Sequence, residues 1–307
     1  MKIVLLDAIT FGDTDLSCFE QFGEVYSFAS TNPSLTAVRI KDMDVIVTNK
    51  VLITKEHMQN APSLKLICVA ATGMNNVDLE AADELGIEVK NVAGYSTDSV
   101  VQHTFSMLFY LMGHSRYYDE VVKSKEYSRS GVFTDVSHPF FEIKGKTWGI
   151  IGLGAIGREV ARVARAFGAN VIYYSTSGRN SSEDYEQVVL HKLIESSDII
   201  SIHAPLNART EKLLNYEKLQ HLKEGAVVLN LGRGGIIDEK AVASIIDERE
   251  LYFGLDVFEK EPLPQESPLL AVKNSERLYL TPHIAWTSVE AREKLIASVC
   301  QNIKESF

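Results

Sequence analysis

The chain has 307 residues, which exceeds the usual size of one domain and therefore predicts two. Its composition, 45% hydrophobic and 23% charged, is that of an ordinary globular protein with enough apolar residues for a core. The net charge of −10 argues against nucleic acid or an anionic membrane as the main partner, because both require a basic face.

The opening residues and the three cysteines bear on the cellular compartment. The start MKIVLLDAIT has one Lys and a short apolar run broken by Asp7, so we interpret it as a first strand rather than a signal peptide. Cys18, Cys68 and Cys300 are far apart and form no CxxC, which predicts neither a disulfide framework nor a metal site. We therefore expect a cytoplasmic protein.

The first hundred residues alternate short apolar runs with segments of helical spacing. The strand-like runs are KIVLLDA (2–8), VIVTN (45–49), LKLICVA (64–70) and IEVKN (87–91). This β-α-β-α order favours a mostly parallel sheet with helices on both faces. From Thr97 onward, TDSVVQHTFSMLFYLMGHSRYYDEVVKS predicts one long helix that would bridge the first domain to the next.

A second β-α-β-α series follows, and it begins with a glycine-rich turn. WGIIGLGAIGREVARVARAFGANVIYY holds Gly152, Gly154 and Gly157 in GxGxxG spacing, between a strand and a helix that leads to a second strand. Gly152 permits the tight turn, Gly154 leaves room for a pyrophosphate, and Gly157 lets the helix pack on the strand. Because the helix N-terminus also offers N–H groups to phosphates, the unit predicts a dinucleotide site.

Three later segments place polar side chains where strands of this series end. NLGRGGIID presents Arg233 between glycines, and its guanidinium suits a substrate carboxylate. GLDVFEKEPLP presents Asp256, Glu259 and Glu261, and LTPHIAW presents His283. A carboxylate that accepts from an imidazole orients it and raises its pKa, so that it can donate a proton near neutral pH. Taken alone, Arg233 could be a surface residue in a turn and His283 could have a structural role. Taken together with the acid, they predict a reaction centre beside a nicotinamide.

In this order and spacing, GLGAIG, NLGRGGIIDEKAV, LDVFEKEP and TPHIAW resemble the D-isomer-specific 2-hydroxyacid dehydrogenases. The resemblance covers essentially the whole chain and is strongest for the glycerate dehydrogenase/hydroxypyruvate reductase branch. It implies an α/β fold of two Rossmann-like domains, with parallel sheets flanked by helices and the active site in the cleft between them. The implied domains are 1–97 with 287–307 for substrate binding and 98–286 for the dinucleotide, and the family is commonly a homodimer through the latter.

The reaction implied by the resemblance is NAD(P)-dependent reduction of a small 2-oxo acid, hydroxypyruvate or glyoxylate, to the D-2-hydroxy acid, and the reverse. The family's carboxylate-binding Arg falls on Arg233, and its Glu-before-Pro and catalytic His fall on Glu261 and His283. D-lactate or a branched-chain 2-oxo acid is the alternative substrate. A formate dehydrogenase is the nearest enzyme rival, although that branch carries Gln where Glu261 stands. A non-enzymatic, NAD(H)-sensing corepressor-like protein is the alternative of another class.

The resemblance also implies further contacts with substrate and cofactor. ATGMNNVD matches the loop whose backbone N–H groups bind the substrate carboxylate, at Thr72 and Gly73. Lys50 lies in another loop that would face the cleft and assist, and a solvated Lys is the alternative. The other positions that match cofactor contacts are Thr104, Ala155, Ile156, Ala204, Pro205, Thr210, Leu231 and Asp256, the last toward the nicotinamide amide.

The turn after the strand VIYY bears on the choice between NAD and NADP. Ser175 stands where NAD-specific members carry Asp or Glu for the adenosine ribose hydroxyls. Ser175, Thr176 and Ser177 offer hydroxyls instead, and Arg179 is close enough in sequence to pair with a 2′-phosphate. We therefore expect NADP to be slightly preferred, with an NAD enzyme that manages with hydroxyls as the alternative.

Overall fold

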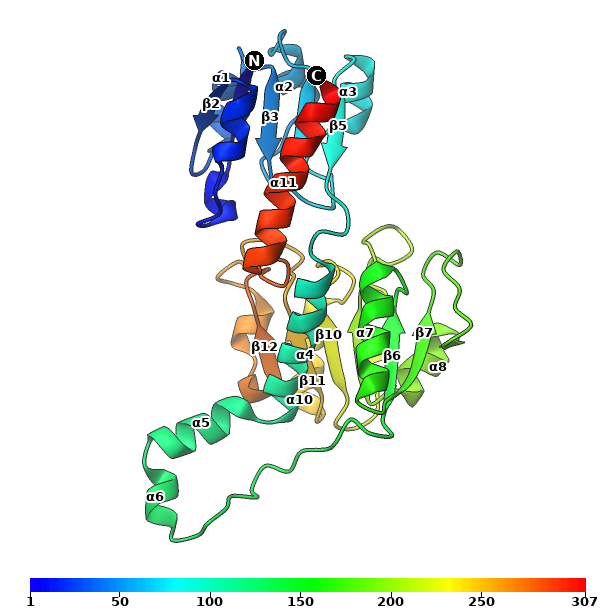
Figure 1. Cartoon of the computed structure of the whole chain (residues 1–307). Coiled ribbons are helices and arrows are strands. Elements are labelled where there is room, and N and C mark those ends of the chain that lie inside the picture. Colours follow the sequence, from blue (N-terminus) through cyan, green and yellow to red (C-terminus); the bar gives the residue numbers. More distant parts are fainter. The chain divides into compact units, whose positions relative to one another are not determined.

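The computed structural model describes residues 1–307, and contacts divide the chain into two compact α/β units. The first comprises Met1–Ser96 and Thr287–Phe307, and the second comprises Thr97–Trp286. The sequence-based boundary follows residue 97, whereas the contacts divide the chain after Ser96. Each unit is a parallel sheet flanked by helices (Figure 1).

The first unit contains a five-stranded parallel sheet in the order β2-β1-β3-β4-β5. Its strands are β1 (Lys2–Leu5), β2 (Glu24–Ser27), β3 (Val45–Thr48), β4 (Leu66–Val69) and β5 (Glu88–Asn91). Its helices are α1 (Thr36–Ile40), α2 (Lys55–Gln59), α3 (Leu79–Glu84) and α11 (Val289–Ser306). β3 and β4 are buried along their whole length, as expected where helices cover both faces of a parallel sheet. β2 was not predicted, because its four residues are exposed or half-buried and lack an apolar run.

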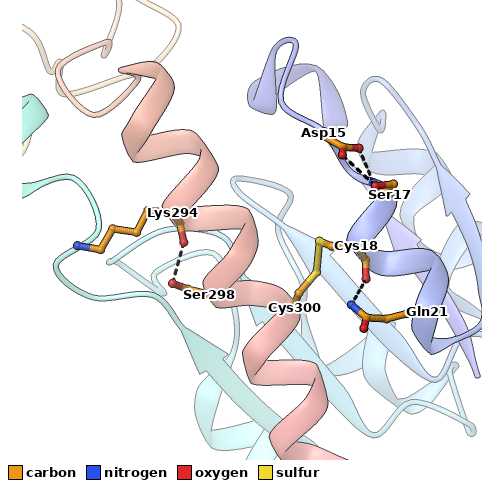
Figure 2. Close-up of a disulfide and its surroundings, with 7 residues drawn as sticks. All are labelled: Asp15, Ser17, Cys18, Gln21, Lys294, Ser298 and Cys300. Carbon is orange, nitrogen blue, oxygen red and sulfur yellow. Dashed lines mark hydrogen bonds between the residues drawn. A yellow bond between two sulfur atoms is a disulfide. The ribbon is translucent and has the colours of Figure 1, made fainter.

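The C-terminal helix packs on the sheet of the first unit, where α11 buries Leu295 and Val299 (Figure 1). It also carries Cys300, which forms a disulfide with Cys18 of the 3-10 helix Ser17–Phe22 (Figure 2). The expectation that the cysteines are unpaired was therefore wrong. The two lie 282 residues apart, so no local motif marks them, and only the return of α11 brings them together. Cys68 is free, and burial raises the pKa of its thiol to about 12.

The second unit contains a seven-stranded parallel sheet in the order β12-β11-β10-β9-β6-β7-β8. Its strands are β6 (Thr147–Ile151), β7 (Asn170–Tyr174), β8 (Glu186–Gln187), β9 (Ile199–Ile202), β10 (Val227–Asn230), β11 (Tyr252–Leu255) and β12 (Leu278–Leu280). Its helices are α4 (Thr97–Met112), α5 (Ser115–Lys123), α6 (Glu126–Ser130), α7 (Ala155–Ala166), α8 (Leu190–Ser196), α9 (Tyr216–Leu219) and α10 (Glu239–Glu248). α4 and α7 pack together over one face of the sheet (Figure 1).

The segment predicted as one long helix, 97–124, contains two helices, α4 and α5, and α6 follows it. α4 ends at Met112, and the chain turns at Gly113 and His114, whose φ of 45° lies in the left-handed region. A second left-handed residue, Lys125, separates α5 from α6. The apolar periodicity runs through both turns, so the pattern alone could not locate them. α5 and α6 project from the body of this unit (Figure 1).

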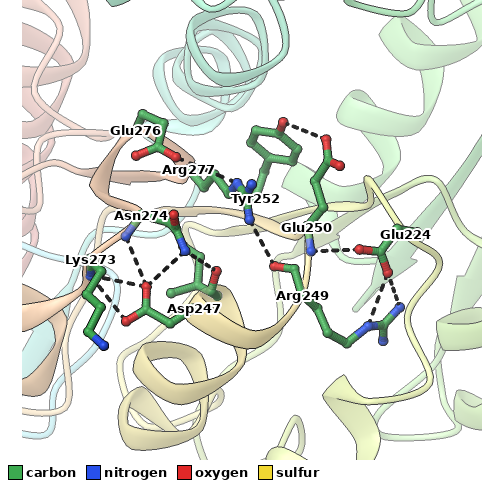
Figure 3. Close-up of polar contacts among 10 residues, drawn as sticks. Glu224, Asp247, Arg249, Glu250, Tyr252, Lys273, Asn274, Glu276 and Arg277 are labelled. Atoms are coloured by element: carbon green, nitrogen blue, oxygen red, sulfur yellow. Dashed lines mark hydrogen bonds and ion pairs between the residues drawn. The ribbon is translucent and has the colours of Figure 1, made fainter.

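A polar cluster closes the amino-terminal end of β11 (Figure 3). Arg249 donates from Nε and Nη2 to Glu224 Oε2 at 3.2 and 2.8 Å, and its other bonds reach the carbonyl oxygens of Gln220 and Leu222. The backbone N–H of Glu250 donates to Glu224 Oε1 at 2.7 Å. The bonds from Arg249 and from Glu250 N–H lower the pKa of Glu224. This cluster joins the loop before β10 to the end of α10.

We expect Arg249→Ala to lower the free energy of unfolding by about 1–3 kcal/mol at neutral pH, because Glu224 and two carbonyls lose their donor. The pKa of Glu224 is lower in the folded chain, so its stabilisation is present above the unfolded pKa and is lost as pH falls through the folded one. Urea unfolding at decreasing pH should therefore show the deficit shrinking. Arg116→Ala, which removes only an exposed pair with Glu120, should leave the free energy of unfolding nearly unchanged, and equal losses in the two variants would contradict the prediction.

Candidate active site

The glycine-rich turn joins β6 to α7, and its three glycines meet three different surroundings. Gly152 has φ +94°, and a Cβ there would lie 2.9 Å from the backbone of Ala204. A Cβ on Gly157 would lie 2.2 Å from the carbonyl oxygen of Gly152, so only glycine lets α7 pack this closely. A Cβ on Gly154 would meet nothing within 4 Å, so open space lies beside this residue. The turn thus has the tight bend, the close helix packing and the open side that a pyrophosphate requires.

The N-terminus of α7 faces this turn with unused hydrogen-bond donors. The first bond of the helix runs from Arg158 N to Gly154 O at 3.0 Å, and no side chain caps the helix. The N–H groups of Ala155, Ile156 and Gly157 therefore have no acceptor within the chain. Free N–H groups at the positive end of a helix are a favourable site for phosphate.

A cavity of about 470 Å³ extends from this turn between the loops that follow β7 and β9. Gly152, Gly154, Thr176, Ser177, Arg179 and Pro205 of the predicted contacts line it, together with Asn180, His203, Asn207, Ala208 and Arg209. The cavity has room and donors for a dinucleotide.

Several of the predicted cofactor positions are buried and do not line this cavity, among them Ala204 and the four residues described next. Ser175 is 8% exposed, and its hydroxyl has no partner. Thr104 is fully buried and donates to Val100 O at 2.7 Å, while Thr210 is fully buried and donates to Pro205 O at 2.7 Å. Leu231 is 6% exposed. In the structure the two threonine hydroxyls hold the backbone, and their contact with a cofactor stays a prediction.

Arg233 follows β10 in a turn that packs on the loop after β11. A Cβ on Gly234 would lie 1.8 Å from the carbonyl oxygen of Phe258, so the two loops touch through their backbones. The buried Asn230 side chain donates to Arg233 O at 2.9 Å and accepts from Gly232 N at 3.1 Å, which fixes the turn. The half-buried Arg233 guanidinium contacts Gly232 O at 2.8 Å and no acidic side chain. It therefore remains available to an anionic ligand.

The loops after β11 and β12 bring Glu261 and His283 together. His283 Nδ1 lies 2.7 Å from Glu261 Oε2, and Glu261 Oε1 accepts from Phe258 N at 3.1 Å. The Glu259 carboxylate bonds elsewhere, because its Oε1 accepts from Glu239 N at 3.4 Å. Since Nδ1–H is held by the carboxylate, Nε2 of the imidazole is the ring atom left for chemistry. The pair has the arrangement of an oriented proton donor or acceptor.

Asp256, at the end of β11, fixes the loop that carries His283. Its Oδ1 accepts from Thr281 Oγ1 at 2.6 Å and from Ile284 N at 2.8 Å, and Oδ2 accepts from Ala285 N at 2.9 Å. His283 itself has φ +55°, a strained value for a residue with a side chain. The buried carboxylate thus holds both flanks of a strained residue. Asp256 was predicted as a nicotinamide contact; its three protein bonds make it first a support for His283.

Two residues of α4, which the sequence did not single out, hold the same loop from the other side. Ser99 Oγ donates to Ala285 O at 2.7 Å, and His103 Nε2 lies 3.2 Å from Thr281 Oγ1. Burial lowers the pKa of His103, and the charge of Asp256, 3.7 Å away, opposes this effect. Positions 99 and 103 are one helical turn apart, so they face the loop together. Only the spacing could have marked them, and it does not name their partner.

In the first unit, Thr72 and Gly73 follow β4. Their N–H groups have no acceptor within the chain, while Thr72 Oγ1 donates to Val92 O at 3.2 Å and Thr72 O accepts from Asn91 at 2.6 Å. The turn is therefore fixed with two amides free for an anion. The exposed Lys50 follows β3, where its own N–H donates to Asp7 Oδ2 at 2.7 Å.

No three His, Cys, Asp or Glu side chains are placed to hold a metal ion together. None of the helices combines the length and the apolar character needed to cross a bilayer.

Comparison with known proteins places the chain among dehydrogenases. Residues 105–285 match the family "D-isomer specific 2-hydroxyacid dehydrogenase, NAD binding domain". A putative 2-hydroxyacid dehydrogenase of Haemophilus influenzae is 36% identical over 99% of this chain and 98% of its own length. A hydroxypyruvate reductase of Blautia hydrogenotrophica is 34% identical over 99% of this chain and 96% of its own. Among solved structures, an acyclic imino acid reductase in complex with NADPH and D-arginine is 31% identical with a TM-score of 0.85, covering 99% of this chain and 96% of its own.

We expect Asp256→Asn to loosen the loop around His283, because the amide oxygen can replace only one of the two accepting oxygens, and the amide nitrogen would then face a donor. The free energy of unfolding should fall by about 1–3 kcal/mol, and hydrogen exchange at Ile284 and Ala285 should accelerate. Asp247→Asn is the control, because Asp247 accepts from the Lys273 and Asn274 amides away from this loop. Unchanged exchange at both amides in Asp256→Asn would show that the carboxylate does not hold the loop.

Proposed function

Because the chain belongs to the D-isomer-specific 2-hydroxyacid dehydrogenases, we propose that it reduces hydroxypyruvate or glyoxylate to the D-2-hydroxy acid and catalyses the reverse. The observation that carries the proposal is the bond between His283 and Glu261, supported by Asp256 at the end of the neighbouring strand. The name of the Blautia relative supports hydroxypyruvate as the first choice. The carboxylate of Glu261 favours a reaction with proton transfer over formate oxidation, which requires none.

The proposed mechanism assigns one task to each side chain. Arg233 binds the substrate carboxylate through its planar guanidinium. The bound nicotinamide supplies the hydride for the carbonyl carbon. His283 donates a proton from Nε2 to the oxygen that becomes the hydroxyl, and Glu261 keeps the imidazole oriented and stabilises its charged form. In the reverse direction the same nitrogen accepts the hydroxyl proton.

The first unit has a carboxylate-binding turn of its own in this proposal. The free N–H groups of Thr72 and Gly73 are suited to a carboxylate oxygen, because backbone donors in a fixed turn need no reorganisation to bind an anion. We assign Lys50 an auxiliary electrostatic role toward the same group.

For the cofactor, we propose a slight preference for NADPH over NADH. Thr176, Ser177 and Arg179 line the cavity after β7, and no Asp or Glu lines it. A carboxylate there would repel a 2′-phosphate, whereas these groups can donate to one. The NADPH in the related imino acid reductase structure supports this proposal for a chain of this fold.

For the assembly, we propose a homodimer through the second unit. Exposed apolar side chains gather on α5, on α6 and in the segment that follows: Val122, Tyr127, Val132, Phe133, Val136 and Phe140. Phe133 is 89% exposed and Val136 is 79% exposed, which is costly for a monomer in water. A second copy of the same segment would cover them.

We assign the enzyme to the cytoplasm, where the nicotinamide cofactors of central metabolism are held.

The test of the reaction is turnover of purified protein with a panel of 2-oxo acids against NADH and NADPH. We expect hydroxypyruvate or glyoxylate to give the highest kcat/KM, and His283→Ala to lower kcat by about 10²-fold or more because the proton donor is lost. Glu261→Gln should cost less, since the amide oxygen can still accept from the imidazole. His191→Ala, which changes an exposed histidine on α8, is the control. Near-full turnover of His283→Ala on every substrate would refute the assignment.

The dimer is tested by sedimentation velocity at several protein concentrations. We expect the native chain to sediment as a dimer, and Phe133→Asp with Val136→Asp to shift it to the monomer, because burying two carboxylates in the interface is unfavourable. Val38→Asp, at a side chain 75% exposed in the first unit, should leave the dimer intact. A monomeric native chain at all concentrations would exclude the proposed assembly.

A further inference from the structure

Two arginines in the second unit differ from the others in the chain. The sequence contains twelve arginines, and ten of them donate from the guanidinium to an oxygen of the protein. The two that do not are Arg179 and Arg209, and both line the cavity of about 470 Å³ beside the glycine-rich turn. They reach it from different loops, one after β7 and the other after β9. Two unpaired guanidiniums in one cavity indicate an anionic ligand.

The rest of the cavity lining is consistent with an anion at this end. Thr176 and Ser177 contribute hydroxyls, Asn180 contributes an amide, and no Asp or Glu lines the cavity. The chain as a whole has a net charge of −10, whereas this cavity is lined by arginine and by no carboxylate, so its local charge is positive. The other end of the cavity, at Gly152 and Gly154, adjoins the free amides of α7. The cavity therefore offers two separate places for phosphate groups.

The loop that carries Arg209 is well fixed, so the side chain is presented from a defined backbone. Thr210 Oγ1 donates to Pro205 O at 2.7 Å and accepts from Asn207 N at 2.8 Å. The N–H of Arg209 itself donates to Asn207 Oδ1 at 2.9 Å. These bonds leave only the side chain of Arg209 to be ordered by a ligand, which keeps the entropic cost of binding low.

We propose that Arg209 is a determinant of cofactor specificity, which forms with Arg179 a two-arginine clamp on the 2′-phosphate of NADPH. The proposal rests on the proposed function, because it assigns the cavity to the dinucleotide of that reaction. A 2′-phosphate is a compact dianion at neutral pH, and two guanidinium groups can neutralise it from opposite sides. Arg209 would then act across the cavity from the turn where specificity is expected. A guanidinium can also stack on adenine, and the experiment distinguishes this role from the clamp.

The test measures nucleotide binding by calorimetry, without any turnover. Adenosine 2′,5′-bisphosphate and 5′-AMP are titrated into the native chain, Arg209→Ala, Arg179→Ala, the double variant and Arg129→Ala, an exposed control outside the cavity. We expect the native chain to bind the bisphosphate more tightly. Arg209→Ala should weaken bisphosphate binding about tenfold, the scale of one charge-assisted hydrogen bond, and 5′-AMP binding less than twofold. Arg209→Lys should recover part of the loss.

Three outcomes would overturn the clamp. Equal weakening of both nucleotides in Arg209→Ala would assign Arg209 to adenine stacking, and no weakening would remove it from the site. A native chain that binds the two nucleotides equally would show that no 2′-phosphate site exists. In parallel, the ratio of kcat/KM for NADPH and NADH should fall about tenfold in Arg209→Ala. If the native chain reduced no 2-oxo acid, the proposed reaction would fail, while the binding data would still decide the role of Arg209.

Discussion

The buried carboxylate of Asp256 connects the two strand ends on which the proposed chemistry depends. It follows β11 directly, and it accepts from Thr281, Ile284 and Ala285, which surround His283 in the loop after β12. Because His283 has a strained left-handed backbone, its position requires such external bonds. Glu261, in the same loop as Asp256, can then meet Nδ1 of His283 at 2.7 Å. One carboxylate therefore supports the backbone and another orients the ring.

The parallel sheet explains why these groups meet. The neighbouring parallel strands β10, β11 and β12 end at the same edge of the sheet, so the loops that follow them lie next to one another. The contact between Gly234 and Phe258 O shows how close the loops of β10 and β11 come. α4 completes the support, because Ser99 and His103 bond to the loop of His283 from the helix that packs on β10 and β11.

Local pattern predicted much of this arrangement, and long-range contact accounts for the remainder. The GxGxxG spacing, the apolar runs and the polar residues after them are short-range signals, so the sheets and the strand-end positions of Arg233, Glu261 and His283 followed from them. Glu261 directly precedes Pro262, and this local feature identified it as the counterpart of the family's catalytic acid. Its hydrogen bond to His283 could not be predicted from the sequence, because only the fold brings the two residues together. The backbone oxygens that Thr104 and Thr210 bond could not be predicted, because a hydroxyl does not reveal which acceptor the fold will bring to it. The Cys18–Cys300 pair and the part of α4 in the site join segments more than 170 residues apart, and no spacing rule relates them.

The two ends of the second sheet differ in how their charges are used. At the amino end of β11, the Arg249 guanidinium donates to Glu224 and to two carbonyl oxygens. Asp247 accepts from two backbone amides, so the polar groups at this end have partners within the chain. At the carboxyl ends of β7 and β9, Arg179 and Arg209 have no partner, and the first amides of α7 are also unmatched. Hydrogen-bond donors that the chain itself leaves unmatched are available to an anion, so the groups at this end of the sheet would supply the affinity of the proposed cofactor site.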